Sequence, residues 1–358
     1  MTVGILGIGT YLPPEVRRND WWSDEVVARW RVQQAQRMDA LRRAPAMPTE
    51  GMQRVVGATL ALDGDPFEGA VTRHVLGPEQ TSLEMERAAA EDAIARAGID
   101  RGAIDLLLSY PAVPDYLLSN TACELHHRLG LASGCLALET NASAYSFLAQ
   151  LALAVPMIAS GRVRHALLVQ SAAISRLIDP GDPVAARVGD AATAVVVGPV
   201  ADGYGVLGDY HRTDGRSPRT LIATVPGARW YDGKPTMQMA DPDGARRVFL
   251  GSVDQAKESV DGALAAAGRS VDAVDFLAVH HATPWVGAVV GAHAGLARAR
   301  TADLFPTTAY VFAASIPLIL AAGERAGALG AGDLAMLVGA GPGMMYGATV
   351  LRWGGRPS

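Results

Sequence analysis

Apolar residues occur along this chain in two alternating patterns. Short apolar runs, typical of buried strands, lie at residues 105–110, 134–138 and 165–170. Longer runs of helical length, each followed closely by a glycine, lie at residues 82–97, 119–129 and 147–158. We also expect a first strand at residues 2–13 and a helix at residues 20–43. Strands that alternate with helices predict an α/β fold with parallel sheets covered on both faces.

Residues 44–80 follow neither pattern. Pro, Gly and Asp are scattered through this stretch, and no regular apolar spacing recurs in it. Structureless segments of this length inside a compact protein are uncommon and often functional. We therefore expect residues 44–80 to form an inserted loop or lid.

The chain contains an internal repeat. A shift of 170 residues places Ala93 on Ala263, Gly98 on Gly268, Asp105 on Asp275 and Pro114 on Pro284. A shift of 169 places residues 166–169 on residues 335–338. Two matched helix–strand pairs in the same order predict two similar α/β halves, residues 1–200 and 201–358. The junction between the halves is then the natural place for a site.

Composition narrows the class of protein. Apolar residues make up 49% and charged residues 19% of the 358 residues, which is typical of a well-packed globular protein. The net charge of −5 gives no general basic surface for nucleic acid. The two cysteines have no metal-ligand spacing, and no leader or apolar run of membrane-spanning length is evident. We expect a cytoplasmic protein without a metal site.

The passage from strand to helix at residues 138–147 is the first candidate for chemistry. Ser143 is a plausible N-cap of the helix that follows. Residues 142–145 would then lie where unpaired N–H groups and the positive end of the helix dipole gather. Such a place suits a nucleophile or an oxyanion, although an ordinary structural junction has the same local features.

Three further candidates lie in the second half. His280, with His281 as its competitor, ends the apolar run 276–279, and ligand-binding groups in α/β proteins commonly occupy the carboxyl ends of strands. Residues 307–317 repeat the strand-to-helix passage of the first half. In residues 338–347, Gly341 and Gly343 permit close backbone approach, so exposed N–H groups there could form an oxyanion site. Pro342 has no N–H to donate.

Together these stretches resemble the β-ketoacyl-ACP synthase III branch of the thiolase superfamily, over nearly the whole chain. The matching pieces are Leu12–Pro13, Asn19, residues 72–74, Ala97–Gly98, residues 187–190, residues 314–317 and residues 351–353. Their order and spacing carry the resemblance, because no single piece is specific. It implies a thiolase fold, in which two pseudo-repeated halves form a five-layered αβαβα sandwich.

The resemblance implies a Cys-His-Asn triad, but two of its members are replaced here. The cysteine slot is Ala144, the histidine slot is His280, and the asparagine slot is Tyr310. Without the asparagine, the enolate of a decarboxylating condensation loses one donor, at a cost of about 2–4 kcal/mol. The resemblance is therefore closest to enzymes of natural-product and antibiotic assembly, including polyketide pathways, that transfer an acyl group to a hydroxyl or amine. A decarboxylating ketosynthase is the less favoured enzymatic alternative.

The nucleophile is left open by the sequence. Ala144 has no reacting group, and it is either an engineered replacement of a native cysteine or the natural residue. Ser143 or Ser146 could serve instead, although each is out of register. Transfer could also be direct, with His280 as the base that activates the acceptor. Finally, the chain could be a catalytically silent subunit that pairs with an active homologue.

The resemblance also implies substrates and partners. The donor would be acyl-CoA or the phosphopantetheine of an acyl-carrier protein, reaching the site through a tunnel between the halves, with no tightly bound cofactor. Arg246 and Arg247 resemble the basic edge that meets the carrier protein, and Trp30 is a candidate contact for CoA. His211 could approach the site from the second half. A small molecule would be the acceptor, and the family pairs through its central strands, which implies a homodimer.

Overall fold

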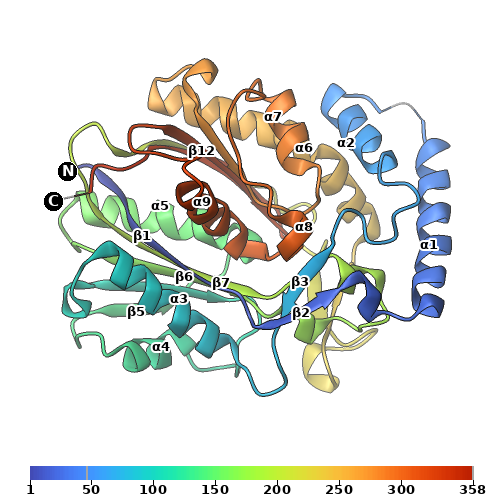
Figure 1. Cartoon of the computed structure of the whole chain (residues 1–358), viewed down its shortest axis with the longest axis horizontal. Helices are drawn as coiled ribbons and strands as arrows, with labels where there is room; N and C mark the ends of the chain where they lie inside the picture. The colour runs from blue at the N-terminus through green and yellow to red at the C-terminus, as the bar shows by residue number, and fades with distance from the viewer. Residues whose placement is uncertain (46, 357–358) are drawn as a thin grey trace.

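The structure is a computed structural model that describes residues 1–45 and 47–356 (Figure 1). Its strands are β1 (Val3–Tyr11), β2 (Glu15–Arg18), β3 (Thr72–Val75), β4 (Leu106–Pro111), β5 (Leu136–Glu139), β6 (Ala166–Ala172), β7 (Ala191–Pro199), β8 (Gly205–Thr213), β9 (Ile222–Thr224), β10 (Thr236–Gln238), β11 (Phe276–Val279), β12 (Leu334–Gly341) and β13 (Met345–Arg352). Its helices are α1 (Asp24–Arg42), α2 (Glu50–Leu60), α3 (Ser82–Ala97), α4 (Thr121–Leu129), α5 (Ser146–Ala159), α6 (Pro242–Ala267), α7 (Val286–His293), α8 (Phe305–Thr308) and α9 (Ser315–Arg325).

Two large sheets have matching topologies. The first has the order β1-β7-β6-β4-β5 and the second the order β8-β13-β12-β11. In each sheet the first two pairings are antiparallel and the later pairing, β6 with β4 or β12 with β11, is parallel. The sheets are therefore mixed, and the expectation of purely parallel sheets is wrong. The reason is local: β7 and β13 return beside the strands that precede them instead of crossing over a helix.

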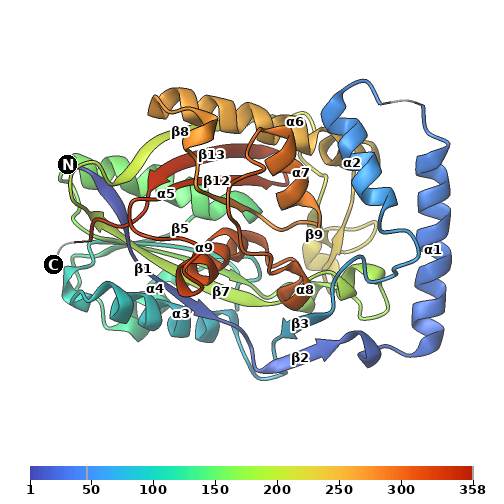
Figure 2. The same cartoon turned by 45° about the horizontal axis from the view of Figure 1, so that its top comes forward.

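The elements stack in five layers, as Figures 1 and 2 show. Helices α3 and α4 cover the outer face of the first sheet, and α6 and α7 cover the outer face of the second. Helices α5 and α9 lie between the two sheets. This is the αβαβα sandwich of the thiolase fold, as expected.

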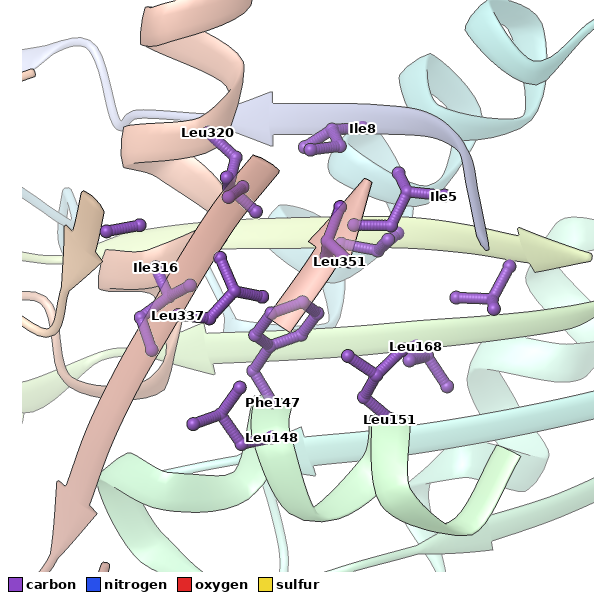
Figure 3. Packing of buried hydrophobic residues seen from close by; sticks show 14 of the residues in the cluster. Ile5, Ile8, Phe147, Leu148, Leu151, Leu168, Ile316, Leu320, Leu337 and Leu351 are labelled. Atoms are coloured by element: carbon purple, nitrogen blue, oxygen red, sulfur yellow. The ribbon is translucent and has the colours of Figure 1, made fainter. Parts of the chain in front are cut away.

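The central layer is held by one apolar core shared by both halves. Phe147 and Leu151 from α5 and Ile316 and Leu320 from α9 pack between Leu168 of the first sheet and strands of the second (Figure 3). Each fully buried aliphatic or aromatic side chain stabilises the fold by about 1.5–3 kcal/mol. Because α5 and α9 each begin at a candidate stretch, this core fixes both starts relative to one another.

The repeat extends to the backbone conformation. Helices α3 and α6 both end at a glycine in the left-handed conformation, Gly98 and Gly268. The short 3₁₀ turns that precede α5 and α9, η3 (Ser143–Tyr145) and η8 (Phe312–Ala314), both begin at a residue with a positive φ. These values are +52° at Ser143 and +49° at Phe312. The first sheet uses residues up to 199 and the second begins at 205, so we place the boundary between the halves close to residue 200.

The expectation of irregular structure across residues 44–80 is wrong. This stretch contains α2 and β3, and Val55 of α2 is fully buried among apolar residues of α6 and α7. Thr49 caps the start of α2 and also donates a hydrogen bond to Asp254 of α6. The insertion of the first half thus packs on the outer helices of the second (Figure 2). Its irregular parts are the turns between α2 and β3 and the loop after β3.

Strand β5 is an edge strand, not the buried strand that its apolar sequence predicts. Leu136 and Leu138 are 48% and 43% exposed. At the matching edge of the second sheet, β5 is replaced by a single parallel bridge between Arg300 and Phe276 of β11. Cys135, just before β5, is buried in the core between the first sheet and its outer helices. None of the helices described is long and apolar enough to cross a membrane.

Candidate functional site

The turn before α5 differs from the expected N-cap. Ser143 starts η3 with a left-handed backbone, and α5 begins after Tyr145 without a side-chain cap. The turn is closed by Ser146, whose hydroxyl accepts from the Ala142 N–H at 3.0 Å and donates to the Ser143 carbonyl at 2.7 Å. Ser146 is fully buried with both capacities used, so it is not available as a nucleophile.

Ala144 is buried at the centre of a separate apolar cluster. Its buried neighbours include Ile174 and Val188 from the first half and Phe312 from the second. Tyr310 packs against the same cluster. The methyl group at the presumed cysteine slot therefore faces side chains from both halves of the chain.

His280 follows the last residue of β11 and is the histidine that faces this cluster. The backbone N–H of His280 donates to the Val338 carbonyl at 3.1 Å, which holds the residue beside β12. Its ring lies edge-on to the ring of Tyr310, with centroids 6.0 Å apart. Burial, with a contribution from His281, lowers the pKa of His280 to about 4, so the ring is neutral at pH 7. His281 instead lines a cavity beside α7.

Tyr310 is held on both sides. Its N–H donates to the Arg187 carbonyl, and its carbonyl accepts from the Gly189 N–H, each at 3.0 Å. Its ring stacks on Phe312 with centroids 4.5 Å apart. Burial raises the pKa of its hydroxyl well above the usual range, so the group stays protonated. Tyr310 thus contacts His280 and also packs against the cluster that contains Ala144.

Tyr110 is a site residue that our sequence reasoning did not select. It lies near the end of β4, the first-half strand that corresponds to β11, and its hydroxyl is close to the Ser143 side chain. Burial raises the pKa of Tyr110 to about 12. The signal was present in the sequence, because the 170-residue shift places Tyr110 on His280.

The glycines of residues 338–347 are needed for close packing against Tyr145, which the sequence did not reveal. A Cβ at Gly341 would lie 2.7 Å from the Ala142 carbonyl and 3.1 Å from the Tyr145 Cβ. A Cβ at Gly347 would lie 2.2 Å from the Tyr145 hydroxyl. These glycines let the Tyr145 ring lie flat on β12 and β13. Gly343, with a φ of +93°, forms the turn between these strands, and an oxyanion role for Gly341 and Gly343 stays a prediction.

His211 approaches the site, as the sequence suggested. Its Nδ1 hydrogen-bonds the Tyr145 hydroxyl, and its Nε2 lies 3.3 Å from Asp209 Oδ2. His211 Nε2 is buried and makes no hydrogen bond within the described residues, although the Asp209 carboxylate lies near it. A chain of polar contacts thus runs from the turn beside Ala144 to the exposed carboxylate of Asp209.

Backbone strain gathers at this site. Of the six non-glycine residues with positive φ in the described chain, four lie in the candidate stretches: Ser143, Ala309, Phe312 and Met344. Such conformations cost about 1–3 kcal/mol each and concentrate where function requires them.

Part of the site is open to solvent. Ser143, His280 and Tyr310 each keep partial solvent exposure. Two cavities, of about 370 Å³ and 310 Å³, lie away from these residues, beside Trp353 and beside α7. The tunnel between the halves therefore stays a prediction. In the described part of the chain, no three His, Cys, Asp or Glu side chains are grouped to hold a metal.

The three residues expected to contact the donor differ in their exposure. Arg246 and Arg247 are exposed in the first turns of α6, and Arg247 donates to Ser217 Oγ at 3.1 Å. Trp30 is only 1% exposed, lies between Trp22 and Phe67, and donates its indole N–H to the Gly181 carbonyl. Trp30 therefore anchors α1 to the body of the protein and offers no face to CoA in this structure, contrary to our expectation.

The five-layered fold and the paired helix starts define a thiolase-fold protein of the kind that condenses or transfers acyl groups. Two family models match the chain. The model for 3-oxoacyl-[acyl-carrier-protein (ACP)] synthase III covers residues 138–215, and the model for the C-terminal part of the same synthase covers residues 264–353. The first match contains Ala144, and the second contains His280 and Tyr310.

Individual relatives agree with these matches. A β-ketoacyl-[acyl-carrier-protein] synthase III of Thermosynechococcus vestitus is 31% identical over 297 residues, covering 80% of this chain and 88% of the relative. One from Neisseria meningitidis is 29% identical over 289 residues, with the same coverage. The crystal structure of 3-oxoacyl-(acyl carrier protein) synthase III (FabH) from Pseudomonas aeruginosa is 27% identical, with a TM-score of 0.78 and full coverage of both chains. This chain belongs to the 3-oxoacyl-ACP synthase III family.

Proposed function

We propose that this protein transfers an acyl group from a CoA or carrier-protein thioester to a hydroxyl or amine acceptor, without decarboxylation. The observation that carries the proposal is the meeting of the three strained stretches around Ala144. His280 contacts Tyr310, Tyr310 and Phe312 pack with Ala144, and Gly341 abuts the turn that contains Ala144. A role in natural-product assembly follows from this choice of acceptor.

The chemistry is limited by the side chains present. Ala144 has no nucleophile, so in this chain the acceptor attacks the thioester carbonyl directly. Its proton passes to neutral His280, the tetrahedral intermediate collapses, and the departing thiolate takes the proton from the imidazolium. The slot at residue 144 is where a cysteine would take the acyl group. Decarboxylation is disfavoured because it would need histidine and asparagine together on the carbonyl of a second, malonyl thioester. The asparagine slot holds Tyr310, stacked on Phe312.

The donor would dock at the start of α6. Arg246 and Arg247 project from an exposed turn and provide a local positive charge on a protein whose net charge is negative. An acidic carrier protein fits such an edge by charge complementarity. Free CoA would use the same edge through its phosphates, with no tightly bound cofactor required.

A second copy of the chain is the expected partner at β5. This edge strand exposes Leu136 and Leu138, and the loop before α4 exposes Leu117 and Leu118 beside the same end of the sheet. An exposed apolar edge strand is a template for strand pairing. A homodimer that joins the two first sheets would cover it, and light scattering during size-exclusion chromatography measures this directly.

Release of CoA from octanoyl-CoA tests the transfer. We expect release to depend on an added short-chain alcohol or amine as stand-in acceptor, and to fall at least about 100-fold in His280→Ala, within the range for a positioned base. Malonyl-CoA should release no CO₂. Acceptor-independent decarboxylation of malonyl-CoA would instead identify a ketosynthase and overturn the proposal.

A catalytically silent subunit is the second candidate, and the missing nucleophile at Ala144 favours it. In that case neither this chain nor Ala144→Cys would release CoA from octanoyl-CoA. The chain would instead form a stable complex with a second synthase-like protein. CoA release by the isolated chain excludes this candidate.

A further inference from the structure

The Tyr310 hydroxyl is a polar group without a partner inside an apolar site. Within the described residues it makes no hydrogen bond, yet it is not among the fully buried unsatisfied atoms. The oxygen therefore borders open space instead of packing against carbon. A phenol hydroxyl in such surroundings normally finds a partner, so its freedom here needs an explanation.

The ring that holds this hydroxyl is fixed on several sides. The backbone of Tyr310 is bonded to both neighbours of Val188, its ring stacks on Phe312, and its edge meets His280. A donor that is already oriented needs little reorganisation when it binds a developing charge. The apolar neighbours of Ala144 make that hydrogen bond stronger than it would be in water. Tyr11 provides a contrast, because its hydroxyl accepts a hydrogen bond from Gln80 at 3.2 Å and the residue packs outside the Ala144 cluster.

We propose that Tyr310 is a catalytic residue whose O–H donates a hydrogen bond to the carbonyl oxygen of the bound thioester as that oxygen becomes negative. The inference rests on the proposed acyl transfer and adds the group that stabilises its oxyanion. In the step, the carbonyl carbon gains a bond to the attacking nucleophile and the C=O π electrons move to oxygen. The Tyr310 proton is shared with that oxygen and returns when the thiolate leaves.

The role is separable from the role of His280. His280 handles the proton of the nucleophile, whereas the Tyr310 O–H meets the oxygen of the electrophile. Loss of the hydroxyl should therefore lower the rate of the chemical step and leave binding of the thioester unchanged. Removal of the Tyr11 hydroxyl, which accepts a hydrogen bond from Gln80 outside the Ala144 cluster, should change neither.

Acylation of a cysteine placed at residue 144 tests this without a known acceptor. In Ala144→Cys, the rate of acylation by octanoyl-CoA is followed by intact mass as a function of octanoyl-CoA concentration. We expect Tyr310→Phe in this background to lower the limiting rate about 100-fold, the scale for one lost oxyanion donor, with the half-saturating concentration unchanged. Tyr11→Phe, which also removes one phenol oxygen but lies against the outer core of the first sheet, should change the rate less than about 3-fold, because no donor to the substrate is lost.

The outcomes separate the two proposals. Equal limiting rates in the presence and absence of the Tyr310 hydroxyl would overturn this inference while the acyl-transfer proposal stands. A parallel rise in half-saturating concentration with no change in limiting rate would also overturn it, because Tyr310 would then serve binding alone. No acylation of the introduced cysteine in any variant would remove the acyl-transfer proposal itself.

Discussion

The low pKa of His280 makes a quantitative prediction about stability. Its folded pKa is about 4, against 6.5 for a free histidine, because burial disfavours the charged ring. The unfolded chain therefore binds a proton between pH 6.5 and 4 that the folded chain does not. His280 consequently stabilises the folded state least at low pH, and its contribution is lost as pH falls through this window. At pH 5 the loss amounts to about 2 kcal/mol relative to pH 7.5.

The pH dependence of the unmodified protein will not reveal this loss, because a buried carboxyl acts in the opposite direction. Burial raises the pKa of Glu86 to about 8. The folded chain then binds a proton that the unfolded chain does not bind between pH 8 and 4.5, so Glu86 adds stability as pH falls. From pH 7.5 to pH 5 that gain is about 3 kcal/mol, and it opposes the losses at His280 and at His281, whose pKa burial also lowers to about 4.

A difference measurement isolates the histidine. Urea unfolding, followed by tryptophan fluorescence at pH 7.5 and pH 5.0, is compared between the unmodified protein and His280→Gln. We compare the free energy of unfolding of His280→Gln with that of the unmodified protein. On going from pH 7.5 to pH 5.0, we expect this difference to change by about 2 kcal/mol in favour of His280→Gln. His127→Gln, which replaces an exposed histidine on α4, is the matched control and should gain less than about 0.5 kcal/mol. Equal pH dependence of His280→Gln and the unmodified protein would refute a desolvated, neutral His280.

Three other substitutions test the surroundings of the site. Tyr145→Phe leaves Nδ1 of His211 without its partner and should lower the free energy of unfolding by about 1–3 kcal/mol in urea. Gly347→Ala adds a methyl group 2.2 Å from the Tyr145 hydroxyl and 2.2 Å from the Tyr210 carbonyl, so we expect a loss of at least about 3 kcal/mol; a smaller loss would show that the sheet yields there. On going from pH 7.5 to pH 5, Glu86→Gln should lose about 3 kcal/mol of stability relative to the unmodified protein, and equal pH dependence of the two would mean that Glu86 binds no proton in this range.

The sequence predicted best where structure is decided locally. Helix α3 has the expected bounds because Thr81 and Glu84 form a capping box at its start and Gly98 adopts the left-handed conformation at its end. Helix α2 was missed because Gly51 and Gly57 weaken its local signal, and the helix is stabilised by burying Val55 against α6. Tertiary packing decides such an element.

The same distinction holds within the site. Ala144, His280 and Tyr310 could be located from the repeat and the order of motifs, and the fold brings their side chains or neighbours together. The hydrogen bond between Tyr145 and His211 joins residues from different halves, so no local sequence pattern predicts it. The burial of Trp30 likewise depends on where the 179–182 loop passes, which the sequence around Trp30 does not specify.

The central claim is that residue 144 occupies the position where an acyl group would be received. It is tested most directly by peptide mass spectrometry on Ala144→Cys after incubation with octanoyl-CoA. We expect the octanoyl group on the introduced cysteine and not on Cys123, although Cys123 is exposed and position 144 is buried. His280→Ala in the same background should abolish the modification. Octanoylation confined to Cys123, or spread over the introduced cysteine and both native ones, would contradict the account.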